Sequence, residues 1–223
     1  MKLSLDYIIK LNLILFFLFA SSSAFLRVND WLPIYFLFLI LSHLFFFYKI
    51  ILYHDFNNNF SYSADIFIII FLACLLFNTT MLYNLRSINY LLAYFFIIFT
   101  HYFLLKFTLF NSFSKKGILD INSIGIIFLS IIIITEFISV NFLNYDIQSL
   151  LPRSREASAL SASGTIRRSY GLSTEPGQVA LFIETLGPLA IWQITKWNKT
   201  ILYKFFIIGL IIFAFIFTFS SAG

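Results

Sequence analysis

The sequence predicts an all-α fold, a polytopic bundle of about seven transmembrane helices with one long extracytoplasmic loop. Hydrophobic residues make up 60% of the 223-residue chain and charged residues only 11%, whereas a soluble domain carries about 25% charged residues to solvate its surface. The apolar residues also form runs of about 20, the length that crosses roughly 30 Å of hydrocarbon as a helix. The shorter, alternating segments typical of a transmembrane β-barrel are missing from the sequence.

The apolar runs follow one another along the chain and are separated by polar connections rich in Asn, Asp, Ser, Gly and Lys, as expected between antiparallel helices. We place the spans at 8–26, 31–53, 65–82, 88–110, 118–143, 176–195 and 201–219. Lys2 and Lys10 before the first run also fit a cleaved signal peptide, but the rest of the chain is equally apolar, which favours a retained helix.

One connection is far longer than the others and divides the chain into three parts. Residues 1–143 form a five-span N-terminal bundle, residues 144–175 form a polar loop, and residues 176–223 supply two further spans. A loop of this length in a compact protein is usually functional or disordered.

The distribution of basic residues predicts the orientation, because short cytoplasmic loops are enriched in Lys and Arg. If the N-terminus is cytoplasmic, the short outer loops hold only Arg27 and Arg86. Nine lysines then lie on the inner side: Lys2, Lys10, Lys49, Lys106, Lys115, Lys116, Lys196, Lys199 and Lys204. This orientation places the loop 144–175 outside.

The long loop carries four arginines on the side where basic residues are scarce: Arg153, Arg155, Arg167 and Arg168. The planar guanidinium group of arginine binds phosphate through two parallel hydrogen bonds, whereas lysine acts as a point charge. The loop therefore predicts an anion site at the outer membrane surface. The alternative is a solvated basic loop, or one that rests on anionic lipid headgroups.

Ionisable residues within the spans each require an explanation, because a charge is expensive in hydrocarbon. Glu136 and Glu184 are expected to face the bundle or a water-filled cavity, and a structural, hydrogen-bonded carboxyl is the alternative for Glu136. His43 and His101 are interpreted as structural histidines rather than proton carriers. The single cysteine, Cys74, lies in an apolar run, and the Cys and His spacing of a metal site is missing.

Residues 171–176, which lead from the loop into the sixth span, have the local preferences of a turn followed by a helix start. Gly171 permits a tight turn, and Ser173 or Thr174 can cap the following helix. Pro176 suits the first helical turn, and Glu175 lies where the helix dipole stabilises a carboxylate. A helix is therefore expected to begin near Pro176.

This stretch resembles the O-antigen ligase and polymerase (Wzy-like) family of membrane glycosyltransferases, in which an arginine, a glycine and a Glu-Pro step open a transmembrane helix. The matching residues are Arg168, Gly171, Glu175, Pro176 and Ala180. A second similarity is the Ser-rich segment 220–223 after the next apolar run, and a third is the pair Arg155 and Gly171, with fifteen residues between them.

The resemblance implies a metal-independent glycosyltransferase that polymerises lipid-linked oligosaccharide repeat units into a surface polysaccharide. The donor would be an oligosaccharide on a polyprenyl pyrophosphate, in the cytoplasmic (inner) membrane of a bacterium, with flippase and chain-length regulator proteins as further partners. No cofactor or nucleic acid is implied. The implied catalytic residues are Arg168, Arg155 and Glu175, and the implied pyrophosphate- and glycan-binding residues are Arg153, Arg167 and Gly171.

Two other functions fit the same residues. A ligase would move finished glycan to another lipid, and a transporter or flippase of lipid-linked sugars would also present basic groups to pyrophosphate. A transporter is expected to contain internal repeats and broken helices, and we find no convincing repeat in the sequence. Family members are nearly twice this length, so the chain is expected to be a truncated N-terminal portion with an incomplete site.

Overall fold

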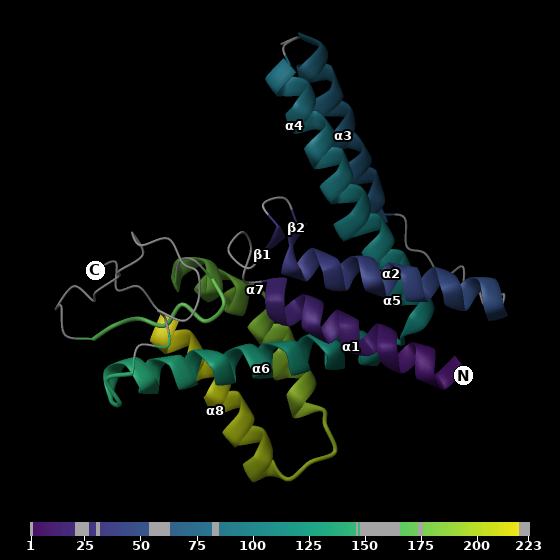
Figure 1. Ribbon diagram of the computed structural model, residues 1–223. Helices are drawn as coiled ribbons and strands as arrows, with labels where there is room; N and C mark the ends of the chain where they lie inside the picture. Colours follow the sequence, from purple (N-terminus) through teal and green to yellow (C-terminus); the bar gives the residue numbers. More distant parts are fainter. Residues whose placement is uncertain are drawn as a thin grey trace.

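The computed structural model describes residues 2–20, 27–29, 32–53, 63–81, 85–145, 147, 166–173 and 176–218. The described part is helical, as predicted, except for loops and one two-stranded antiparallel sheet. The elements are α1 (Lys2–Ala20), β1 (Arg27–Asn29), β2 (Leu32–Pro33), α2 (Ile34–Tyr53), α3 (Ser63–Met81), α4 (Leu85–Ile98), the π-helix η1 (Phe99–Leu104), α5 (Leu105–Ser112), α6 (Lys115–Asn141), α7 (Pro176–Thr195) and α8 (Ile201–Thr218) (Figure 1).

Four helical segments in the described part are long and apolar enough to cross a membrane: Ile34–Tyr53, Leu91–Ser112, Lys115–Asn141 and Ile201–Thr218. They fall at the second, fourth, fifth and seventh predicted spans, so the chain is an α-helical membrane protein. The other predicted spans fall on α1, α3 and α7. Charged and amide side chains interrupt the apolar sequence of α1 and α7. The apolar part of α3, Asp65–Phe77, is shorter than the four segments that are long enough to cross a membrane.

The first helix differs most from its prediction. It begins at Lys2 and ends at Ala20, whereas the sequence predicted a span over 8–26. The charged residues near its start are accommodated by the next helix, because Lys49 of α2 donates a hydrogen bond of 2.6 Å to the Asp6 carboxylate. This ion pair offsets both charges, and the helix includes residues 2–7, which precede the predicted span.

The core forms around α6, which packs against α1, α7 and α8. The α1–α6 contact is close: a Cβ added to Gly125 would lie 3.0 Å from the Cβ of Phe17. Further along α6, branched and straight aliphatic side chains fill the space between the helices. The fully buried members of this cluster include Ile126, Leu129, Ile133, Val179, Ala190, Ile194, Ile211 and Ala214.

Helices α3 and α4 form a hairpin that projects away from this core (Figure 1). Large apolar side chains such as Phe67, Phe71 and Phe95 are exposed along it, as expected of surfaces that contact lipid. The base of the hairpin is held by polar contacts, since Lys106 lies 2.7 Å from the Asp65 carboxylate.

Candidate functional site

The candidate site lies where the residues before α7 return to the helical core. We call residues 166–173 the docked segment. It is deeply buried from Ser169 onward: Ser169 and Ser173 have no exposed surface, and Tyr170 is 2% exposed. A polar loop end is rarely buried in this way, because its backbone groups then need partners inside the protein. The partners come from α6 and α8.

The central partner is Glu136 of α6, whose side chain is 3% exposed. Its Oε2 atom accepts hydrogen bonds from the backbone N–H groups of Tyr170 (3.0 Å) and Gly171 (2.6 Å). Successive N–H groups that converge on one anion form a small positive concavity, which stabilises a buried carboxylate. The expectation that Glu136 faces the bundle is confirmed, and the two N–H groups that it accepts from here belong to the end of the loop.

Gly171 provides the backbone geometry for this contact. Its φ of +56° lies in the left-handed region, which glycine adopts without the steric cost that a Cβ imposes. A Cβ at this position would also lie 3.0 Å from Cγ1 of Ile133. The predicted tight turn at Gly171 is therefore confirmed.

We expect Gly171→Ala to lower the free energy of unfolding by about 1–2 kcal/mol, the cost of the left-handed conformation for a residue with a Cβ. Thermal unfolding of the protein in detergent micelles measures this change. Gly177→Ala is the matched control, because a Cβ added there meets no atom within 4 Å. Equal unfolding temperatures for the two variants would contradict the structural role of Gly171.

The docked segment is also fixed at its start and in its middle. The Asn141 side chain, at the end of α6, pairs with both backbone groups of Arg167: the Arg167 N–H donates to Oδ1 (2.7 Å), and Nδ2 donates to the Arg167 carbonyl (2.8 Å). The Ser169 N–H donates to the carbonyl of Phe217 in α8 (3.1 Å). The segment therefore bridges the ends of α6 and α8.

The segment then turns into α7. The Ser173 N–H donates to the Tyr170 carbonyl (3.0 Å), and the Ser173 hydroxyl donates to Oε1 of Gln178 (2.7 Å). Helix α7 begins at Pro176, as predicted. Ser173 thus connects the turn to the first part of the helix through its side chain, and Thr174, the other predicted capping residue, lies outside the described residues.

Three of the predicted site residues are placed by the structure. Arg167 is exposed and Arg168 is partly buried, and both belong to the docked segment with Gly171. The other three, Arg153, Arg155 and Glu175, lie outside the described residues. The structure therefore brings two arginines to the end of the helical core, beside the turn that Glu136 holds.

Sequence reasoning missed Asn141 as a site residue. It is the last residue of α6 and lies five positions after Glu136. An amide at the end of a membrane helix is common, so the sequence offered little signal for it. Its role depends on a chain segment 26 residues further along.

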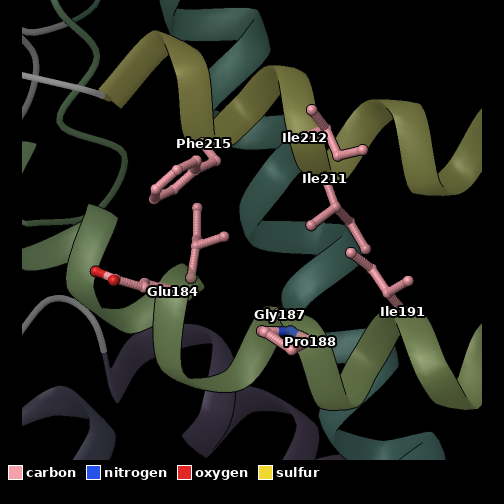
Figure 2. Close-up of a pocket in the computed structure, with 8 residues that line it drawn as sticks. Glu184, Gly187, Pro188, Ile191, Ile211, Ile212 and Phe215 are labelled. Carbon is pink, nitrogen blue, oxygen red and sulfur yellow. The ribbon is translucent and has the colours of Figure 1, made fainter.

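The second glutamate of the spans, Glu184 in α7, is exposed, so of the two predicted surroundings it does not have the first, the interior of the bundle. It lines the edge of an open, apolar groove of about 220 Å³ between α7 and α8. Figure 2 shows its carboxylate directed away from Ile191 and Ile211. Within the groove wall, Pro188 has no N–H to offer the carbonyl of Glu184, four residues earlier.

The site thus combines two adjacent arginines, an amide that binds the Arg167 backbone, a buried carboxylate that binds the turn after them, and a helical core with lipid-facing sides. Such an arrangement can present fixed positive charge to an anionic group at the end of a membrane bundle. No family model, curated protein or solved structure matches the chain.

Proposed function

We propose that the protein is a polysaccharide polymerase, a membrane glycosyltransferase that joins oligosaccharide repeat units carried on polyprenyl pyrophosphate. The observation that supports this proposal most is the docked segment, which holds Arg167 and Arg168 at the end of the membrane helices through Glu136 and Asn141. The resemblance of Arg168, Gly171, Glu175, Pro176 and Ala180 to the polymerase and ligase family points to the same chemistry.

The proposed topology has seven spans, a cytoplasmic N-terminus and the loop 144–175 outside the bacterial inner membrane. In this arrangement the docked segment is the end of the outer loop. The polyprenyl chain lies among the lipid-facing helices, and the pyrophosphate and its sugars lie at the level of the loop. Arginines at this boundary meet the charged group of the donor where the hydrocarbon ends.

In the proposed reaction, the hydroxyl oxygen of an acceptor glycan forms a bond to the anomeric carbon of the donor sugar. The bond between that carbon and the pyrophosphate oxygen breaks, and polyprenyl pyrophosphate leaves with the bonding electron pair. Negative charge develops on the leaving group, so arginines aimed at it stabilise the transition state more than the ground state. We assign this role to Arg168 and Arg155, with Arg153, Arg167 and Gly171 binding the donor.

The hydroxyl proton of the acceptor passes to a base. Glu136 is an unsuitable base, because its carboxylate accepts two backbone N–H bonds in a buried position. Glu175 is the proposed base, at the start of α7 where the helix dipole favours a carboxylate. The chemistry proposed here uses side chains of the protein and no metal.

The test is a polymerisation assay with the full-length protein in proteoliposomes and labelled, lipid-linked repeat units as substrate. A polymerase is expected to produce a ladder of longer chains on the same lipid. Arg155→Ala is expected to reduce ladder formation at least about 100-fold, the effect of removing one transition-state charge partner. Lys199→Ala, beyond the opposite end of α7, is the control and is expected to retain activity.

Two outcomes would contradict the proposal. Transfer of finished glycan to a different lipid would indicate a ligase, and movement of the unchanged substrate across the bilayer would indicate a transporter. The sidedness is tested with Ser161→Cys in a Cys74→Ser background, which places a single thiol in the loop for labelling with a membrane-impermeant reagent. A cytoplasmic location for residues 144–175 would overturn the proposed site.

A further inference from the structure

The turn that joins α7 to α8 packs against the start of α6, at the opposite end of α7 from the docked segment (Figure 1). The contact is made by Asp120 of α6, whose Oδ1 atom accepts hydrogen bonds from Nε2 of Gln193 (2.7 Å) and from Nε1 of Trp197 (2.7 Å). This contact gathers lysines from three helix ends on one surface. We call the surface formed by Lys115, Lys116, Lys196 and Lys204 the basic end.

Two lysines of the basic end are held in place by contacts that leave donors available. The ammonium group of Lys196 lies 3.2 Å from the centre of the Trp192 ring, in a cation–π contact. Lys204 donates a hydrogen bond of 2.8 Å to the carbonyl of Thr195. An ammonium group has three donors, so each lysine can also bind an anion.

The basic end lacks counter-charge of its own. The first turn of α6 contains Lys115 and Lys116, both exposed, and no acidic residue, although the positive end of a helix dipole disfavours cations. Lys116 lies one helical turn before Asp120 and so shares its face of α6. Asp120 is the one acidic residue within 115–120 and 193–204, and its Oδ1 atom already accepts two hydrogen bonds. An anion from outside these segments would therefore offset an excess of positive charge.

The surroundings of the basic end indicate that this anion is attached to an apolar chain. Trp192 and Tyr203 are exposed beside the lysines, and both residue types are enriched where hydrocarbon meets headgroups. Large apolar side chains are exposed further along the two helices, at Leu189 of α7 and at Phe205 and Phe206 of α8. A soluble anion would contact the lysines alone, whereas a lipid would also cover these side chains.

We propose that the basic end binds the phosphodiester headgroup of an anionic glycerophospholipid, with the acyl chains along the exposed sides of α7 and α8. Basic pockets between membrane helices are known to bind anionic headgroups of this kind. The inference is independent of the proposed function, because it uses the far end of α7 and none of the residues assigned to glycosyl transfer.

Tryptophan quenching by brominated lipids tests this site in the full chain. The background variant Trp31→Phe leaves Trp192 and Trp197 as the remaining tryptophans. The protein is reconstituted in bilayers that contain brominated phosphatidylglycerol or brominated phosphatidylcholine, and the quenching gives the relative affinity for the two lipids. We expect phosphatidylglycerol to bind at least about 5-fold more strongly, the effect of about one lysine near an anionic lipid.

The double variant Lys116→Gln/Lys196→Gln is expected to lose most of this preference. Lys116→Arg/Lys196→Arg retains both charges and is expected to keep the preference, which separates loss of charge from loss of folding. Arg167→Gln removes an exposed cation beyond the other end of α7 and is the matched control, with an unchanged preference expected. Equal quenching by the two lipids would overturn the proposal. A preference that persists in the glutamine variant, or that is lost in the arginine variant or in Arg167→Gln, would also overturn it.

Discussion

Arg168→Ala is expected to stop chain extension by the full-length protein, with a loss of at least about 100-fold in polymer formed per unit time. The reason is electrostatic: Arg168 is partly buried on a segment fixed by Glu136 and Asn141, so its charge is held in place before the leaving group develops. The polymer ladder on a gel measures the effect, and the amount of protein in the membrane fraction is measured in parallel.

Arg168→Lys separates the contribution of the charge from that of the planar fork. Lysine retains the positive charge but lacks the two parallel hydrogen bonds that a guanidinium makes to phosphate. We therefore expect activity between that of Arg168→Ala and that of the unaltered protein. A normal ladder from Arg168→Ala, in protein that inserts normally, would remove Arg168 from the proposed mechanism.

Glu136→Ala is expected to release the docked segment. The substitution leaves the N–H groups of Tyr170 and Gly171 buried without their acceptor, and each such group costs about 1–3 kcal/mol. A segment freed in this way exposes the peptide bonds after Arg167 and Arg168. We therefore expect limited trypsin digestion to cleave Glu136→Ala at these arginines much faster than the unaltered protein, and mass spectrometry identifies the cut.

The matched control is Glu184→Ala, which removes the exposed glutamate of α7. Its rate of cleavage at Arg167 and Arg168 is expected to equal that of the unaltered protein. Glu136→Gln keeps an acceptor oxygen without the charge and is expected to lie between the two, because charge-assisted hydrogen bonds are roughly twice as strong as neutral ones. Equal cleavage of all the variants would show that Glu136 does not hold the segment.

The helices were largely predictable because each predicted span contains an apolar run of about membrane thickness. The predicted spans 31–53 and 201–219 differ from α2 and α8 by three residues or fewer at each end. The first helix begins six residues before the predicted span, at Lys2, where Lys49 of α2 pairs with Asp6 across two helices. Sequence periodicity contains no information about such a pairing.

The site was predictable only where it depends on local chemistry. The turn at Gly171 and the start of α7 at Pro176 follow from the preferences of those residues. The contacts of Glu136 join positions 34 and 35 residues apart, so they depend on how the loop end meets the core.

The hydrogen bond from the Ser169 N–H to the Phe217 carbonyl joins the backbone beside the arginine pair to the end of α8. Helix tilt changes when bilayer thickness and hydrophobic length differ. A thinner or thicker bilayer that changes the tilt of α8 is therefore expected to shift the backbone that follows Arg167 and Arg168. We therefore expect the position of both guanidinium groups to depend on the chain length of the surrounding lipid.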